Sequence, residues 1–259
     1  MLSKAKIKYI RSLALKKNRK ADAVFVAEGR KLVGDLLPHF TCRYLAATEA
    51  WYSEHPQLVP NLPAEHDLIT EEELQRVSLQ ETPQQVIAIF EQAQDNTPLA
   101  DVAPRELCLM LDGVQNPGNL GTIVRLADWF GIRHVYCSPD CADIYNPKTV
   151  QATMGAMARV SLHYGELSDA LEQLKATAFA PVPVYGTFLD GENLYGKPLQ
   201  SHGVLIMGNE GNGISPQVAR YVSERLFIPN YPPGRATSES LNVAIATAVI
   251  CAEFRRRCG

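Results

Sequence analysis

The chain has 259 residues, of which 46% are hydrophobic and 20% charged, so it can form one large domain or two ordinary ones. Its N-terminus lacks the apolar core and the small-residue cleavage site of a signal peptide, and no apolar run approaches the ~18 residues of a membrane span. The six cysteines are scattered without metal-ligand spacing. We therefore expect reduced thiols, no metal site and a cytoplasmic location.

The formal net charge of −3 hides an uneven distribution. Residues 1–31 contain ten Lys or Arg and two acidic residues, whereas the remainder contains 15 basic and 26 acidic residues. A basic segment on an acidic body predicts a polyanionic partner at one end of the chain. Nucleic acid is favoured over the alternative, a solvated basic helix face without a partner.

The first part of the chain alternates short helices and strands. Thr70 precedes three glutamates, which is typical of a helix start. Apolar periodicity predicts a basic amphipathic helix over 6–17, a strand over 23–29, a helix over 30–37, a strand leading into a helix over 44–51, a helix over 67–78 and a buried strand over 84–90.

A change of composition separates two domains. Residues 91–106 are polar, contain two prolines and show no hydrophobic period, which indicates a linker. We predict a first domain over 1–95, a linker over 96–106 and a second domain over 107–259.

Strands and helices alternate in the second domain, which predicts an α/β fold with a mostly parallel sheet. The expected strands cover residues 107–114, 134–138, 182–189, 203–211 and 226–231. The expected helices cover residues 121–131, 148–160, 168–178, 216–226 and 240–257.

Three loops after strands are candidate sites, because ligands of open α/β sheets bind where strands end. The first, "NPGNLGTIVR" (116–125), lacks both the G-x-G-x-x-G spacing and a Walker lysine, so a phosphate loop and a plain turn both stay open. The second, "MGNEGNGIS" (207–215), places Glu210 among glycines. In the third, "SESLNVAIA" (238–246), Ser238 or Ser240 is a candidate N-cap and Asn242 lies in the first helical turn.

In this order, "NLGTIVR", "LIMGNEGNGIS" and "IPNY…SESLNVAIA" resemble motifs 1, 2 and 3 of the SpoU/TrmH RNA 2′-O-methyltransferases, a family of the SPOUT class. The segments "KIKYIRSLALKKNRKADAVFVAEGRKLV" and "ETPQQVIAIF" resemble its rRNA-type substrate-binding domain, and "NPKTVQATMGAMARV" resembles a family segment between motifs 1 and 2. The chain departs from the family at Gln85, where glycine is usual, and in the longer loop between Pro229 and Ser240, which carries Arg235.

The resemblance implies a C-terminal SPOUT domain, a trefoil-knotted and mostly parallel sheet flanked by helices, plus a smaller N-terminal ribosomal-protein-like α/β domain. It also implies a homodimer that transfers a methyl group from S-adenosyl-L-methionine to a ribose 2′-hydroxyl, with rRNA favoured over tRNA. A tRNA enzyme of the same family and a non-catalytic RNA-binding protein remain the alternatives. A nicotinamide oxidoreductase is disfavoured, because its glycine fingerprint is missing.

Site residues follow from the matching motif positions. Arg125 matches the catalytic arginine, which either stabilises the developing alkoxide and grips a phosphate or accepts the proton; a free arginine is a poor base. We expect Arg125 near the start of its helix. The remaining catalytic candidates are Asn119, Glu210, Ser240 and Asn242. The cofactor candidates are Met207, Gly208, Gly213, Ile228, Pro229 and Leu241, and the RNA-binding candidates are Arg11, Lys16, Lys17, Arg19 and Lys20.

Overall fold

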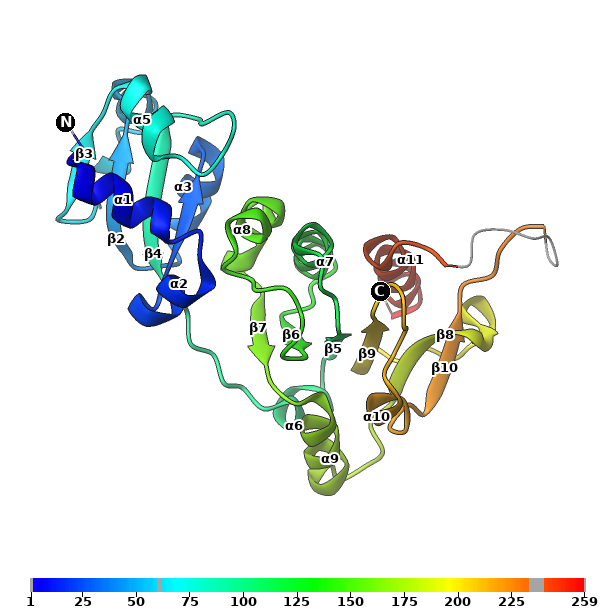
Figure 1. Ribbon diagram of the computed structural model, residues 1–259. Helices are drawn as coiled ribbons and strands as arrows, with labels where there is room; N and C mark the ends of the chain where they lie inside the picture. The colour runs from blue at the N-terminus through cyan, green and yellow to red at the C-terminus, as the bar shows by residue number, and fades with distance from the viewer. Residues whose placement is uncertain (1, 60–61, 233–239, 259) are drawn as a thin grey trace. The chain divides into compact units, whose positions relative to one another are not determined.

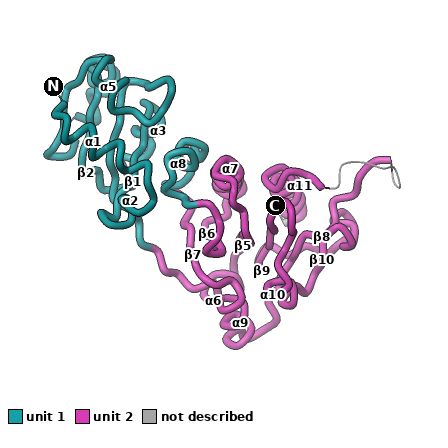
Figure 2. Tube along the Cα trace, in the orientation of Figure 1, with its two compact units in different colours: residues 1–94, 143–158 teal, residues 95–142, 159–259 magenta. Residues whose placement is uncertain are grey.

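The computed structural model describes residues 2–59, 62–232 and 240–258. The chain divides into two compact units (Figure 2), one of residues 1–94 with 143–158 and one of residues 95–142 with 159–259. The predicted domain bounds remain a prediction, and the division by contacts differs from them at residues 143–158.

The first unit is built on a four-stranded mixed sheet in the order β1-β4-β2-β3. Strand β4 pairs antiparallel with β1 and β2, and β3 pairs parallel with β2. The strands are β1 (Val24–Glu28), β2 (Cys42–Ala47), β3 (His66–Leu68) and β4 (Val86–Glu91). The helices are α1 (Lys4–Ser12), α2 (Lys16–Asp22), α3 (Arg30–Leu36), α4 (Glu49–Glu54), α5 (Glu71–Val77) and α8 (Pro147–Thr153), the last followed by the short η2 (Ala156–Ala158).

Two apolar layers hold this sheet. Ile10 of α1 and Leu74 of α5 are fully buried against Val24 and Ile87. An aromatic group that includes Phe25 lies elsewhere in the unit, where Tyr145 packs with its ring centroid 5.0 Å from that of Phe25. This contact helps to explain why residues 143–158 belong to the first unit.

The predicted helix over 6–17 is two helices. The break at residues 13–15 is stabilised by Arg19, whose guanidinium donates to the carbonyls of Leu13 (2.8 Å) and Ala14 (2.7 Å). The predicted start of α5 is confirmed, since Thr70 and Glu73 form a capping box.

The second unit is built on a six-stranded, all-parallel sheet in the order β10-β8-β9-β5-β6-β7, which confirms the predicted fold class. Its strands are β5 (Leu107–Asp112), β6 (His134–Cys137), β7 (Ser161–Tyr164), β8 (Val184–Asn193), β9 (Gly203–Gly208) and β10 (Glu224–Phe227). Its helices are α6 (Leu99–Val102), α7 (Pro117–Trp129), α9 (Leu167–Thr177), α10 (Pro216–Ala219) and α11 (Val243–Cys258), with the short η3 (Leu194–Gly196) after β8.

Helices cover both faces of this sheet (Figure 1): α7 and α11 lie on one face, and α6, α9 and α10 lie on the other. Cys108 and Met110 of β5 belong to a core cluster with Leu171 of α9. Alternate residues of the same strand point to the opposite face, so both faces of β5 are buried, as in a sheet covered on both sides.

Two segments of this unit differ in secondary structure from the predictions. The linker contains α6, because Leu99 and Val102 are spaced i, i+3 and are buried in the core. The predicted helix over 216–226 ends at Ala219 and is followed by β10, which pairs with β8. Within the described residues, no helix is both long and apolar enough to span a membrane. The trefoil knot stays a prediction, because residues 233–239, in the loop before α11, lie outside the described part of the chain.

Candidate active site

The candidate site begins where β5 and β9 end. These neighbouring parallel strands stay in register to their last residues, Asp112 and Gly208. The next residues, Gly113 and Asn209, are also joined, since Asn209 Nδ2 donates to the Gly113 carbonyl over 2.7 Å. The chain leaves both strands at the same edge of the sheet, so the two loops that follow start side by side.

The loop after β5 leads into α7, which begins at Pro117 and not at residue 121 as predicted. Asn116 is the N-cap, and its side-chain oxygen accepts from the main-chain N–H groups of Gly118 (2.8 Å) and Asn119 (3.1 Å). Pro117 has no N–H, and the Leu120 N–H bonds the Asn116 carbonyl. The first turn therefore has no free N–H for a phosphate, which removes the phosphate-loop interpretation of this stretch.

The loop after β9 is a tight turn. Asn209 and Gly213 exchange two main-chain hydrogen bonds of 2.9 Å. A Cβ on Gly208 would lie 2.3 Å from the Gly213 carbonyl carbon, so only glycine fits at this position. The turn carries the exposed Glu210 at its tip.

The third segment enters α11. The Asn242 side-chain oxygen accepts from the N–H groups of Ala244 (3.0 Å) and Ile245 (3.3 Å), so Asn242 is the N-cap. The predicted cap at Ser240 is therefore wrong; Ser240 is exposed, two residues before the cap. Ser238 and Arg235, also named from the sequence, lie outside the described residues.

One hydrogen-bonded chain joins the three segments. Asn119 Nδ2 donates to Glu210 Oε1 over 2.7 Å, and Asn242 Nδ2 donates to Asn119 Oδ1 over 3.1 Å. Glu210 lies 91 positions and Asn242 lies 123 positions after Asn119 in the sequence. The three side chains nevertheless form a single hydrogen-bonded group at the surface. Because all three form hydrogen bonds at the surface of the unit, they offer an organised edge to a polar ligand.

Arg125 lies further from this group than expected. It is the ninth residue of α7, six residues and about 9 Å along the helix axis from Asn119, and on a different face. The prediction that it lies near the helix start is wrong, since α7 starts four residues early. Arg125 is exposed, and none of the hydrogen bonds or ion pairs found among the described residues involves it.

Comparison with known proteins identifies the family. A family model described as "SpoU rRNA Methylase family" matches residues 106–252, more than half of the chain. The chain belongs to the SpoU rRNA methylase family. A second model, described as "MRM3-like substrate binding domain", matches residues 4–88. The N-terminal part of this SpoU rRNA methylase therefore resembles a substrate-binding domain.

Relatives resemble the chain over nearly its whole length. The 23S rRNA (guanosine(2553)-2′-O)-methyltransferase RlmP of Bacillus subtilis is 31% identical, and the alignment covers 96% of each chain. The structure of a TrmH-family protein from Porphyromonas gingivalis is 44% identical with a TM-score of 0.87 and covers 99% of each chain. That of an AdoMet-bound rRNA methyltransferase from Sinorhizobium meliloti is 31% identical with a TM-score of 0.84 and covers 99% of this chain and 96% of that one.

Besides Gly208, described above, the cofactor candidates of this SpoU rRNA methylase differ in which of their atoms a ligand can reach. The Met207 side chain is 2% exposed, so only its main chain can contact a ligand. Ile228 and Pro229 are half-buried beyond the end of β10, and the Leu241 side chain is 49% exposed. Among the described residues, the main-chain N–H and C=O groups of Ile228 and Leu241 form none of the hydrogen bonds found in turns, loops and helix caps. Gly213, with φ of 69°, closes the motif 2 turn.

The RNA-binding candidates also fall into two groups. Lys16, Lys17 and Lys20 of α2, here called the α2 lysines, are exposed. Arg11 is exposed and donates to the Arg76 carbonyl over 2.9 Å. Arg19 is 1% exposed and pairs with Asp143 over 2.7 Å. The prediction that Arg19 contacts RNA is therefore wrong, because its guanidinium holds the first unit together and cannot reach a ligand.

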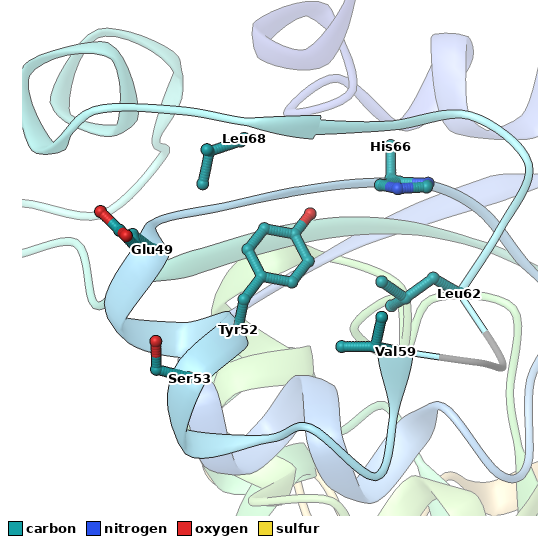
Figure 3. A pocket seen from close by; sticks show the side chains of 7 residues that line it. All are labelled: Glu49, Tyr52, Ser53, Val59, Leu62, His66 and Leu68. Atoms are coloured by element: carbon teal, nitrogen blue, oxygen red, sulfur yellow. The ribbon is translucent and has the colours of Figure 1, made fainter.

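A pocket of about 560 Å³ lies in the first unit, between α4 and β3 (Figure 3). Its lining includes Glu49, Tyr52 and His66 but no Lys or Arg, so it does not suit a phosphate, and we assign it no part in the reaction.

The only metal-like cluster among the described residues is Asp95, His134 and His163. His134 Nδ1 and His163 Nε2 are 3.1 Å apart, and His163 Nδ1 lies 3.0 Å from the Asp95 carbonyl oxygen. These ring nitrogens already satisfy one another, so we propose no metal there.

Proposed function

We propose that the chain is an S-adenosylmethionine-dependent RNA methyltransferase that methylates a ribose 2′-hydroxyl of rRNA. The observation that carries this proposal is the hydrogen-bonded chain Glu210–Asn119–Asn242, which joins the three motif segments of a SpoU rRNA methylase. An RlmP relative named as a 23S rRNA 2′-O-methyltransferase supports the choice of rRNA.

The residues of the chain divide the work of binding and positioning. Adenine presents both a donor and acceptors, which the main chain at Ile228 and Leu241 can pair with, while the partly exposed Leu241 side chain supplies an apolar contact. The residues therefore fit S-adenosylmethionine. When bound, this cofactor supplies an electrophilic methyl group on its sulfonium.

The acceptor ribose is assigned to the exposed side of the Glu210–Asn119–Asn242 chain. We assign to Asn119 and Asn242 the orientation of the ribose and to Glu210 the fixing of Asn119 or a contact with the substrate. We assign to Arg125 the stabilisation of alkoxide charge and the grip on an adjacent phosphate, both of which suit an exposed guanidinium. Ser240 is exposed two residues before Asn242, and we assign to it a contact with the substrate.

A methyl-transfer assay tests the proposal. Labelled S-adenosylmethionine, the protein and either deproteinised rRNA or tRNA are combined, and the labelled ribose is mapped as an alkali-resistant 2′-O-methyl nucleotide. Arg125→Ala should lose at least about a hundredfold in rate while its affinity for the cofactor changes little. The matched control is Arg133→Ala, which removes an exposed arginine just beyond α7 and should leave the rate unchanged.

Other outcomes identify the alternatives. Preferential methylation of tRNA would favour a tRNA enzyme of the same family, and RNA binding without methyl transfer would favour a non-catalytic protein. Full activity of Arg125→Ala would remove its assigned role. We also propose a cytoplasmic location, which the bacterial rRNA methyltransferase relative from Bacillus subtilis supports.

We also propose that the enzyme is a homodimer that pairs through α7 and α11. Two exposed apolar side chains on these helices support this: Trp129, the last residue of α7 (84% exposed), and Ile245 of α11 (55%). Ile245→Glu should convert the dimer to a monomer in sedimentation velocity. A wild-type protein that sediments as a monomer would contradict the proposal.

A further inference from the structure

Asn209 is bonded more fully than its neighbours in the motif 2 turn. Its Oδ1 accepts from the N–H groups of Gly211 (2.9 Å) and Asn212 (3.0 Å), which caps the turn from within. Its Nδ2 donates to the Gly113 carbonyl over 2.7 Å. One side chain therefore fixes both the shape of the turn and its attachment to the end of β5.

Gly113, whose carbonyl Asn209 bonds, is also held through its N–H group. The Gly113 N–H donates to Ser138 Oγ over 2.8 Å, and Ser138, 7% exposed, donates to Asp140 Oδ1 over 2.5 Å. Gly113 has φ of 74°, and a Cβ there would lie 3.2 Å from Asp140 Oδ2. Gly113 is thus a fixed anchor point.

This anchor sets the distance between two motif segments. Glu210 follows Asn209 directly, and Asn116, the N-cap of α7, lies three residues beyond Gly113. A bond between Asn209 and Gly113 therefore fixes the starting points of the two segments whose side chains meet in the 2.7 Å bond from Asn119 to Glu210. The strand register and the bond from the Ser215 N–H to Asp112 Oδ2 (2.7 Å) also hold the turn, and the Asn209 bond adds the constraint that lies next to Glu210.

We propose that Asn209 is a positioning residue that holds Glu210 against Asn119 through its bond to Gly113. The proposal rests on the methyl transfer proposed above, since that reaction gives the position of Asn119 its importance. Asn209 touches neither cofactor nor ribose in this role; it acts through Glu210.

Asn209→Asp is the selective test. Aspartate keeps the oxygen that caps Gly211 and Asn212 but replaces the amide donor with an oxygen that faces the Gly113 carbonyl. The matched control is Asn212→Asp, which adds the same charge to the same turn without altering the bond to Gly113. Asn209→Asp should lower kcat by about ten- to a hundredfold, while the Kd for S-adenosylmethionine changes by less than about threefold. Asn212→Asp should change neither by more than about threefold.

A second background tests whether Asn209 acts through Glu210. In Glu210→Ala there is no carboxylate to position, so adding Asn209→Asp should reduce the single-turnover rate by less than about threefold. An equal loss in both backgrounds, or a kcat for Asn209→Asp within about threefold of wild type, would overturn the proposal.

A measurement without turnover separates this proposal from the function on which it rests. The exchange of the Asn119 side-chain amide protons, followed by NMR in ¹⁵N-labelled protein, should accelerate in Asn209→Asp and stay as in wild type in Asn212→Asp. If the wild type methylates no RNA, the proposed function fails, and this measurement still decides the role of Asn209. Unchanged exchange in Asn209→Asp would overturn it.

Discussion

Replacing Gln85 with glycine should stabilise the protein, although it deletes a side chain. Gln85 has φ of 59°, in the left-handed region that L-residues avoid, and lies directly before β4. Its main-chain carbonyl accepts from the Thr48 N–H over 2.9 Å, so the conformation is held by the sheet. A glycine, which the resemblance described above predicts at this position, would adopt this backbone without strain.

The magnitude follows from opposing contributions. The left-handed conformation costs a non-glycine residue about 1–2 kcal/mol. The buried Gln85 Oε1, which has no hydrogen-bond partner within the described residues, adds a cost on the order of 1 kcal/mol. Against this, glycine loses about 0.5–1 kcal/mol through its freer unfolded state, and removing the methylenes of the half-buried side chain costs roughly another 0.8 kcal/mol. The net expectation is a gain of about 1 kcal/mol.

Thermal unfolding followed by the emission of Trp51 measures this, because Trp51 is fully buried in the same unit. Gln85→Gly should raise Tm by about 2–4 °C. The matched control is Gln84→Gly at the preceding, exposed position, where φ is negative and the substitution should lower Tm. A Gln85→Gly variant that is destabilised as much as Gln84→Gly would refute the reasoning.

Three further results are expected. Replacing the α2 lysines with alanine should flatten the dependence of RNA affinity on salt by roughly 0.7–0.9 in log–log slope for each phosphate that the protein no longer neutralises. Arg19→Ala should instead leave that slope unchanged and destabilise the fold by about 3 kcal/mol in denaturant titration, because it leaves Asp143 without its buried partner. The hydrogen bond from Arg256, and to a smaller extent that from Arg257, lowers the pKa of Glu253 from 4.5 to about 2. The folded pKa lies below the unfolded one, so this stabilisation is complete above about pH 4.5 and is lost as pH falls toward 2; Glu253→Gln should flatten the stability curve in that window.

Local chemistry made much of the fold predictable. The capping box at Thr70 and the continuous apolar run of β5 act over a few residues, and both were found where expected. The early start of α7 was predictable as well, since asparagine followed by proline is a known helix-start signal; the glycines at 118 and 121 obscured it. The helix α6 was not, because Leu99 and Val102 become helical by burial against a core that lies elsewhere in the sequence.

The candidate site was predictable in its members but not in its connections. Asn119, Glu210 and Asn242 were named from the motifs, and the structure brings them together. Asn209 was missed, although an asparagine at the end of a strand and before a glycine turn is a signal for side-chain capping. Arg19 was misassigned because charge alone does not distinguish an exposed cation from one that is buried with a partner 124 residues away.

The structure bears on whether Arg125 accepts the proton or stabilises the charge. A guanidinium releases its proton only where the surroundings penalise its charge, through burial or nearby cations. Arg125 is exposed, and an RNA substrate that buried it would bring phosphates, which favour the charged form. We therefore favour the role of charge stabiliser.

The pH–rate profiles of the wild type and of Arg125→Lys test this role. The lysine variant should be slower by about ten- to a hundredfold. The apparent pKa of the profile should stay the same, because residue 125 is then not the group whose titration controls the rate. An apparent pKa that moves toward that of lysine, about 10.4, would assign the proton to residue 125 instead.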